Sequence, residues 1–256
     1  MKRCLFLFSI AALLAACNTT GTPELAPRSE SGTDTGLAIS AGLDAVKAMT
    51  LTDAEVKSLG LRGVEESDKQ AKVAPAKNKY AKRLAALTKK HAKEDGLQLN
   101  FKVYLTPEIN AFASPDGSIR VYSGLMDMMN DDELRYILGH EIGHVKLGHS
   151  LSAHKAEYLA RAGRKGLAAS GNKGGQLAAS ELGALVEEAF NAQYSQEHER
   201  AADDYGLAFN KKYKYKPKAA VTALQKLAKL GDGGGVFASH PAPTERAQRL
   251  QAQLNK

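Results

Sequence analysis

The sequence predicts an α+β fold that is mostly helical and carries a small, mainly antiparallel sheet. Hydrophobic residues recur at spacings of three and four along most of the chain, as on one face of an α-helix. Between residues 97 and 122 they alternate with polar residues instead, as in half-buried strands. With 256 residues, of which 43% are hydrophobic and 25% charged, the chain suits a single globular core.

The N-terminal segment is predicted to be removed from the mature protein. Lys2 and Arg3 precede an apolar run over residues 5–16, which is too short to span a bilayer as a mature helix. The small residues before Cys17 resemble the lipobox of bacterial lipoproteins. The resemblance implies a signal peptide over residues 1–16, cleavage before Cys17, and acylation of that cysteine. The alternative is an ordinary secretory signal followed by an incidental cysteine.

Acylation would anchor the chain to a membrane, because several acyl chains together give stable attachment. Asn18 rather than Asp follows the cysteine, a pattern that in lipoproteins implies the outer membrane, so we expect a lipid-anchored protein that faces the periplasm. Residues 17–36 are predicted to be the lipidated end and a flexible tether, and residues 37–256 the folded domain. The only cysteines are Cys4 and Cys17, which leaves none for a disulfide in that domain.

The domain is predicted to begin with helices. Thr52 and Glu55 form a capping box at the start of a short helix, which we expect to stop near Gly60. A second helix is predicted over residues 77–94, and Gly96 is expected to terminate it.

Strands are predicted after these helices. Residues 97–105 have the alternation of a half-buried strand. Residues 109–113 and 119–122 flank the sequence Ser114-Pro115-Asp116-Gly117, which is typical of a turn, so we expect a hairpin.

The rest of the chain is predicted to be helical. Asn130 is a suitable N-cap for a helix that runs to about Gly148. The stretch from Leu151 to Gln193 is interpreted as two helices that are broken at residues 171–175. Two more helices are predicted over residues 195–210 and 217–230. A mobile glycine-rich loop is expected at residues 231–235, and a last helix is predicted to start after Pro243.

One predicted helix carries the motif His140-Glu141-Ile142-Gly143-His144. Residues four apart on a helix point the same way, so His140 and His144 present two imidazoles to one point, which suits zinc. Glu141 projects beside them and can act as general base on the water that the metal activates. Gly143 is expected to leave room over the metal. The alternative is a pair of surface histidines on an amphipathic helix.

A catalytic zinc needs a third protein ligand. The extended motif HExxHxxGxxH fails, because Leu147 and Ser150 stand at its last two positions. A glutamate from a later helix is the alternative, and Glu199 is favoured because Asp203, one turn on, can accept the second N–H of a ligand histidine. The residues alone leave a choice among Glu181, Glu187, Glu188, Glu197 and Glu199.

Taken together, the segments HEIGH, SQEHERAAD and SHPAPTERAQRL resemble the HtpX/Ste-type family of gluzincin metalloproteases. The resemblance covers most of residues 75–256. It implies a zincin-like metalloprotease domain, one Zn²⁺ per chain bound by His140, His144 and Glu199, and the activity of a zinc-dependent metalloendopeptidase.

Four further residues are candidates for the site. His240 is expected either to polarise the substrate carbonyl or to cover the zinc as a fourth ligand in a resting state; the alternative is a loop histidine. Arg246 is a weaker candidate for stabilising charge; the alternative is a solvated or structural arginine. The hairpin residues Asn110 and Ala111 are expected to pair with an extended substrate; the alternative is a covered structural strand. The remaining histidines are not expected to be ligands: His91, His149, His154 and His198.

These features predict a membrane-anchored zinc metalloendopeptidase that hydrolyses unfolded or misassembled envelope proteins in quality control, with an outer-membrane protein as a further partner. One rival is a chaperone-like or assembly-factor module with a latent, metal-capped protease site. Another is a purely structural zinc, against which the presence of Glu141 argues. The formal net charge is +7, but no basic stripe is interleaved with aromatics, so nucleic acid is not an expected partner.

Overall fold

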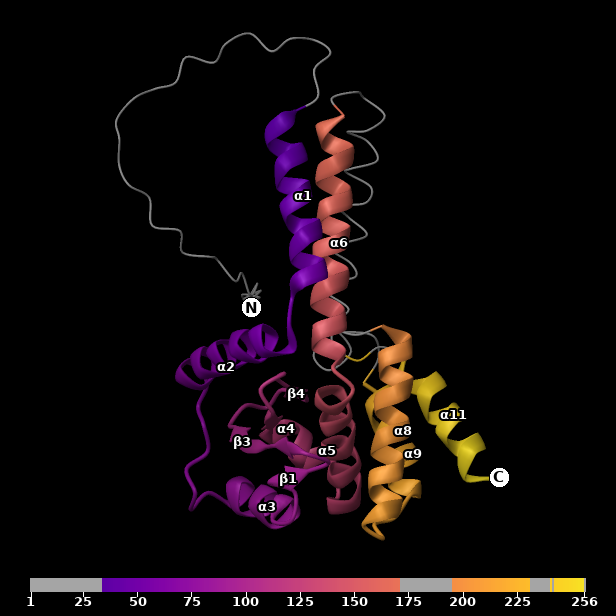
Figure 1. Ribbon diagram of the computed structural model, residues 1–256. Coiled ribbons are helices and arrows are strands. Elements are labelled where there is room, and N and C mark those ends of the chain that lie inside the picture. Colours follow the sequence, from indigo (N-terminus) through magenta and orange to yellow (C-terminus); the bar gives the residue numbers. More distant parts are fainter. Residues whose placement is uncertain (1–33, 171–194, 231–239, 241, 256) are drawn as a thin grey trace, which may run out of the picture. The chain divides into compact units, whose positions relative to one another are not determined.

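The computed structural model describes residues 34–170, 195–230, 240 and 242–255. The predicted signal peptide, Cys17 and most of the tether lie outside these residues, as do the predicted helix break at 171–175 and the glycine-rich loop at 231–235. Figure 1 shows the described elements, which in chain order are α1 (Thr35–Thr50), α2 (Asp53–Gln70), α3 (Lys79–Thr88), β1 (Lys93–Glu94), β2 (Leu97–Gln98), β3 (Asn100–Tyr104), β4 (Ala111–Ala113), β5 (Ser118–Tyr122), α4 (Ser123–Met128), α5 (Asp131–Lys146), α6 (His149–Ala169), α8 (Gln196–Lys212), α9 (Lys218–Ala228) and α11 (Pro243–Leu254).

The predicted α+β class with a small sheet is confirmed, but the three-stranded sheet is mixed rather than mainly antiparallel. Its strand order is β3-β5-β4. The predicted hairpin is confirmed as the antiparallel pair β4–β5, with Ala111 opposite Val121. β3 pairs with the other edge of β5 in parallel, with Phe101 opposite Ile119. The difference arises because β5 lies between β3 and β4 in the sheet. The chain reverses direction twice between β3 and β5, so these two neighbours run parallel.

The helix α1 begins at Thr35, in the last residues of the predicted tether. Asp34 caps it by accepting a backbone hydrogen bond of 3.1 Å. Figure 1 shows α1 lying along α6, and Lys165 of α6 binds Asp44 (2.7 Å) and Ser40 (2.8 Å) of α1. No described helix combines the length and the apolar character that crossing a membrane requires.

The capping box of α2 is confirmed, since Thr52 and Glu55 exchange backbone-to-side-chain hydrogen bonds. The predicted end near Gly60 is wrong, because α2 continues to Gln70. A Cβ atom at position 60 would lie 2.6 Å from Ser114 Oγ. Gly60 therefore lets α2 cross closely over the turn between β4 and β5 instead of ending the helix.

The extended α2 is joined to the sheet by a largely buried ion pair. Asp68 accepts hydrogen bonds from Arg120 Nε (2.8 Å) and Nη2 (3.0 Å), and Arg120 on β5 is buried. Lys102 Nζ and the Tyr104 hydroxyl each donate to Asp68 at 2.7 Å. Burial alone would raise the pKa of Asp68, but these donors outweigh it and lower that pKa. The carboxylate thus stays ionised and holds the end of α2 against β3 and β5.

The helix predicted over residues 77–94 is shorter than expected, because α3 ends at Thr88. Residues 93 and 94 instead form β1, which pairs with β2 in an antiparallel hairpin. Asp95 and Gly96 connect the two strands with φ angles of 47° and 85°. Positive φ at both central residues is the geometry of a type I′ hairpin turn, for which Asp-Gly is a favoured pair. Gly96 therefore closes a hairpin rather than a helix.

The predicted C-terminal helices are confirmed within the described residues, and two of them form the centre of the domain. α5 begins at the capping box of Asn130 and Glu133. It packs against α8 through close glycine contacts (Figure 1). A Cβ at Gly143 would lie 3.0 Å from the Tyr205 Cβ and 3.2 Å from the Ala202 Cα. The expectation that Gly143 leaves room over a metal is therefore wrong, since its role is to let α8 approach α5.

Candidate metal centre

Four buried side chains from three parts of the chain converge on one point. His140 and His144 lie one turn apart on α5, and Glu199 lies in the first turn of α8. His240 lies just before α11. One donor atom from each residue can be chosen so that all four lie within 4.8 Å of one another. Ser195 fixes the start of α8 by accepting a hydrogen bond from the His198 N–H, so its cap places Glu199 toward α5.

The spacing of these atoms suits a tetrahedral metal ion. His140 Nε2 lies 3.0 Å from His144 Nε2 and 3.3 Å from His240 Nδ1. Glu199 Oε1 lies 3.2 Å from His144 Nε2 and 2.9 Å from His240 Nδ1. Zinc bonds of about 2.0–2.1 Å at tetrahedral angles separate neighbouring ligand atoms by roughly 3.3 Å. Imidazole nitrogens with a carboxylate are also the donors that zinc accepts in proteins.

Glu141 stands beside the four donors without joining them. Its side chain is buried, and the His240 Nε2 lies 3.6 Å from its Oε1. Its Oε2 has no hydrogen-bond partner among the described residues. A buried carboxylate oxygen without a partner is costly, which fits a group that receives a proton or water in the working site.

The ring of His140 is held from behind by a buried carboxylate. Asp203 Oδ1 lies 3.1 Å from His140 Nδ1, which leaves His140 Nε2 to face the other donors. The same oxygen accepts a 2.6 Å hydrogen bond from the Tyr136 hydroxyl. The sequence analysis missed Tyr136, although it precedes His140 by one helical turn and therefore shares its face of α5. Burial and the neighbouring Asp203 raise the pKa of Tyr136 well above its ordinary value, so the hydroxyl remains a donor.

Arg246 of α11 binds the carboxylates instead of facing the converging donors. Its Nη2 and Nε donate to the two oxygens of Asp203 at 2.7 and 2.9 Å. Its Nη1 lies 2.5 Å from Glu199 Oε2. This fork directs the other oxygen of Glu199, Oε1, toward the histidines. Arg246 also borders the small cavity beside Glu141 and His240, so its expected contact with substrate stays a prediction.

The second nitrogen of His144 also has a partner that the sequence analysis did not anticipate. His149 Nδ1 lies 2.9 Å from His144 Nδ1, and the ring of His149 stacks on that of His198 at 4.3 Å. His149 and His198 therefore lie outside the group of four converging donors and pack around His144. Burial and the neighbouring His198 lower the pKa of His149 to about 4, so it is neutral and able to accept the His144 N–H.

The electrostatics of the donors are strongly coupled. Burial would raise the pKa of Glu199, but His240 and His140 outweigh it and hold that pKa well below its usual range. Burial would lower the pKa of His140, but Glu199 and the bond to Asp203 outweigh it and raise that pKa to about 9. Burial also holds the pKa of His144 well below its ordinary value. Without a metal, positive charge in this group thus resides on protonated histidine, which a cation would displace.

The predicted substrate-binding residues lie at the edge of the site. Ala111 is the first residue of β4, which is an edge strand because it pairs only with β5 among the described strands. Ala111 lines a small cavity together with His140, Glu141, His240 and Arg246, and the other lining residues are apolar. The neighbouring Asn110 pairs through its backbone carbonyl with Tyr122 N–H at 3.0 Å and does not line this cavity.

Among the described residues, neither the other candidate glutamate nor the histidines expected to be non-ligands join the cluster. Glu197 is exposed on α8, and His154 contacts Glu157 on α6. His91, which follows α3, is buried against Phe209 and Tyr213 at the C-terminal end of α8. The remaining candidates lie outside the described residues: Glu181, Glu187 and Glu188.

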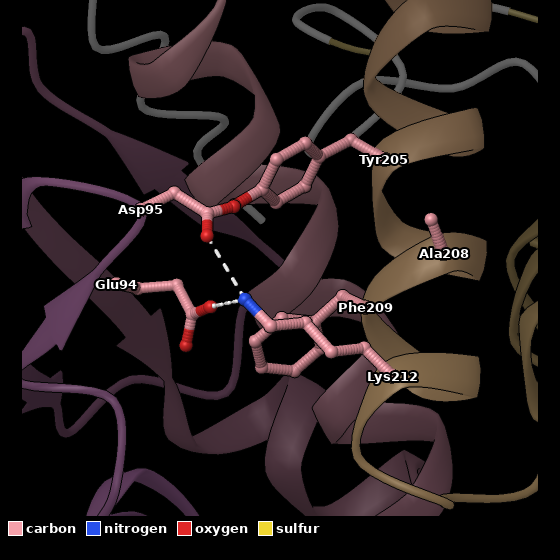
Figure 2. A pocket seen from close by; sticks show the side chains of 6 residues that line it. All are labelled: Glu94, Asp95, Tyr205, Ala208, Phe209 and Lys212. Carbon is pink, nitrogen blue, oxygen red and sulfur yellow. Dashed lines mark hydrogen bonds and ion pairs between the residues drawn. The ribbon is translucent and has the colours of Figure 1, made fainter.

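A second polar group, the Glu94 cluster, consists of His91, Glu94, Asp95, Lys212 and Tyr213. Figure 2 shows Lys212 Nζ donating to Glu94 Oε1 (2.6 Å) and Asp95 Oδ1 (2.9 Å) beside a hollow of about 170 Å³. The Tyr213 hydroxyl lies 2.8 and 2.7 Å from the two Glu94 oxygens, and His91 Nδ1 lies 3.0 Å from Oε2. Both oxygens of Glu94 therefore have protein donors.

Comparison with known proteins gives consistent matches. The model of peptidase family M48 matches residues 75–254. The metalloprotease YcaL of Escherichia coli (strain K12) is 43% identical over 99% of this chain and 97% of its own length. The metalloprotease LoiP of the same organism is 37% identical over 100% and 97%. A protease HtpX homolog of Syntrophobacter fumaroxidans (strain DSM 10017 / MPOB) is 32% identical over 60% of this chain and 58% of its own length.

Proposed function

The chain belongs to peptidase family M48 and is a metalloendopeptidase, and we propose that it uses zinc and acts from a lipid anchor on proteins of the cell envelope. The observation that carries the catalytic part of the proposal is the convergence of three imidazoles and one carboxylate beside the buried, unpartnered oxygen of Glu141. A structural metal site has no need of such an unpartnered carboxylate.

Each side chain of the site has a separate role in the proposed peptide hydrolysis. His140, His144 and Glu199 would hold the metal, and a bound zinc ion would supply Lewis acidity to a water molecule and to the scissile carbonyl. Glu141 would take a proton from the attacking water and pass it to the leaving amine. Asp203 fixes the tautomer of His140 by accepting its Nδ1–H.

Two residues receive more specific roles than the sequence provided. We assign Arg246 to positioning, because its ion pair with Glu199 and its hydrogen bonds to Asp203 orient both carboxylates. We assign the free edge of β4 at Ala111 to substrate binding, because it borders the same cavity as Glu141. Strand addition at such an edge recognises the backbone of an extended segment and tolerates many sequences. This suits unfolded or misassembled envelope proteins.

The location rests on the sequence before Cys17 and on Asn18, as does the quality-control role in the outer membrane. An acylated Cys17 would place the enzyme on the periplasmic face, where such substrates occur, and an outer-membrane protein remains an expected partner. Mass analysis of the membrane-bound wild type should find acyl chains on Cys17, and replacement of Cys17 by Ser should abolish that acylation. An unmodified Cys17 in the membrane-bound wild type would contradict the lipid anchor.

A latent state is a second candidate, and the position of His240 favours it. His240 supplies a fourth donor at the corner that a catalytic site keeps open for water or substrate. In that state the groove would bind polypeptide while cleavage stays slow. His240→Ala should raise casein cleavage if the imidazole caps the metal. It should abolish cleavage if the imidazole stabilises the reacting carbonyl.

The decisive test compares variants of the purified mature protein. Glu141→Gln should keep the metal, identified as zinc by elemental analysis, and lose casein cleavage, because the base is gone and the ligands remain. Glu197→Gln is the matched control, since this exposed glutamate lies on the same turn of α8 as Glu199. Equal cleavage of casein by the wild type and Glu141→Gln would overturn the proposed mechanism.

A further inference from the structure

The helix α1 exposes a continuous apolar face. Ile39, Leu43, Val46 and Met49 follow one another at spacings of four and three, so they share one side of the helix. Their exposed fractions are 66%, 66%, 56% and 80%. Exposed apolar patches of this kind mark surfaces that another molecule covers.

The opposite side of α1 is already packed. Ala41 and Ala48 are buried, and the ion pair of Asp44 with Lys165 joins this side to α6. The contact with α6 is therefore made through small residues and an ion pair, and the larger apolar side chains of α1 remain on its outer side. On an amphipathic helix the apolar side is normally the one that is covered.

We propose that the apolar face of α1 docks on the surface of the lipid bilayer to which Cys17 anchors the chain. The inference rests on the proposed lipid anchor. Residues 18–34 separate Cys17 from α1, and the flexible tether predicted there from composition would have a root-mean-square span of roughly 20–25 Å. The first helix after the anchor is thus held within reach of the bilayer, and a helix with one apolar face binds in the plane of the interface.

The dimensions of α1 favour a bilayer over a second copy of the chain. A helix of 16 residues is about 24 Å long and about 10 Å wide, so one face offers much less than the roughly 800 Å² per partner of a standard protein interface. A bilayer sets no such minimum when an acyl anchor supplies most of the attachment.

The charges of α1 indicate what kind of bilayer contact forms. Lys47 pairs with Glu55 at 2.7 Å, and Asp44 pairs with Lys165 at 2.7 Å. The helix therefore has no surplus of basic side chains for anionic headgroups, and burial of the apolar face would drive docking. Docking should then be insensitive to salt and to anionic lipid, unlike attachment by a polybasic segment.

The test uses the full-length protein isolated from membranes and reconstituted in phosphatidylcholine vesicles. The test variant is Met49→Cys, on the apolar face of α1, and the control variant is Lys211→Cys, at the exposed end of α8. The introduced cysteine of each variant is labelled with a fluorophore. Quenching by nitroxide-bearing lipid and by aqueous iodide is then compared. We expect lipid quenching at position 49 to be at least about two-fold stronger than at 211, with the reverse order for iodide.

Three outcomes would overturn the inference. In the first, iodide reaches both labels equally. In the second, the label at position 49 is shielded from iodide without lipid quenching, which would mean that protein covers the face. In the third, lipid quenching appears only with anionic lipid at low salt. The same preparations are also tested for acylation of Cys17, by mass analysis, and for casein cleavage. If the protein is acylated and active but the α1 face stays in water, the docking inference fails while the proposed function stands.

Discussion

The metal centre and the Glu94 cluster both place a buried glutamate beside a buried histidine, and α8 contributes to both. They differ in what faces the two oxygens of the glutamate. In the Glu94 cluster both oxygens have protein donors, among them Lys212, whose Nζ lies 2.6 Å from Oε1. In the metal centre Arg246 pairs with Glu199 Oε2, whereas Oε1 faces the imidazole nitrogens of His144 and His240. Imidazole nitrogens that converge with a carboxylate oxygen can exchange bound protons for a metal cation, and the Glu94 cluster has no such convergence.

The largest expected effect is on metal binding, which should depend on Glu199 and not on Glu94. Glu199→Gln should lower metal affinity by more than about 100-fold, because it replaces an anionic carboxylate donor by a neutral amide. The loss of a residue that only supports a ligand costs about 10–100-fold. Casein cleavage should fall with it. Glu94→Gln should leave the metal content per chain unchanged in elemental analysis. Loss of metal from Glu94→Gln would break the distinction between the two sites.

A smaller effect is expected at the partner behind His140. Asp203→Asn keeps the shape of the side chain but weakens its hold on the His140 N–H and on Arg246. We expect metal affinity to fall by about 10–100-fold, measured by competition with a chromogenic chelator. Asp204→Asn is the matched control, because Asp204 is the neighbouring aspartate and pairs with Arg249 at the surface. A fall of the same size in both variants would contradict the positioning role.

These two sites also show how far the sequence carries the argument. The His140–His144 pair could be predicted because helical spacing alone fixes its geometry. Glu199 was one of five carboxylates until the resemblance selected it, since its approach depends on how α8 packs. The partners of Glu94 could not be predicted, because Lys212 lies more than a hundred residues away in the chain.

Competing local patterns in the sequence are a second reason why prediction and structure differ. The helical spacing up to His91 predicted a helix as far as residue 94, although the following Asp95-Gly96 pair is a strong signal for a hairpin turn. Gly60 was interpreted as a helix stop because its contact with Ser114 depends on tertiary packing. Tyr136 was overlooked although its spacing from His140 was visible. A search of positions four residues from each ligand would have found it.

In the Glu94 cluster the expected effect is on stability. Glu94→Gln removes the charge that Lys212 and Tyr213 bind, and should lower the free energy of unfolding by about 1–3 kcal/mol. Urea denaturation of the metal-loaded proteins measures this difference. Glu65→Gln, at an exposed position of α2, should change the free energy by less than about 0.5 kcal/mol. Equal effects of the two substitutions would mean that the cluster contributes nothing specific.

The smallest expected effect is the pH dependence of the difference in unfolding free energy between the wild type and Glu94→Gln. Burial alone would raise the pKa of Glu94, but hydrogen bonds from Lys212, Tyr213 and His91 outweigh it and lower that pKa below the value in the unfolded chain. A carboxyl group with a depressed folded-state pKa stabilises the fold above the unfolded pKa, about 4.3 for Glu, and loses that contribution as the pH falls further. The difference in unfolding free energy between the wild type and Glu94→Gln should therefore be constant from pH 7 to about 5.5 and shrink below about 4.3. Both proteins carry the same metal centre, so acid release of the metal contributes equally and cancels. A difference that stays constant or widens on acidification would show that Glu94 is not held ionised by its protein donors, and the contrast with Glu199 would lose its basis.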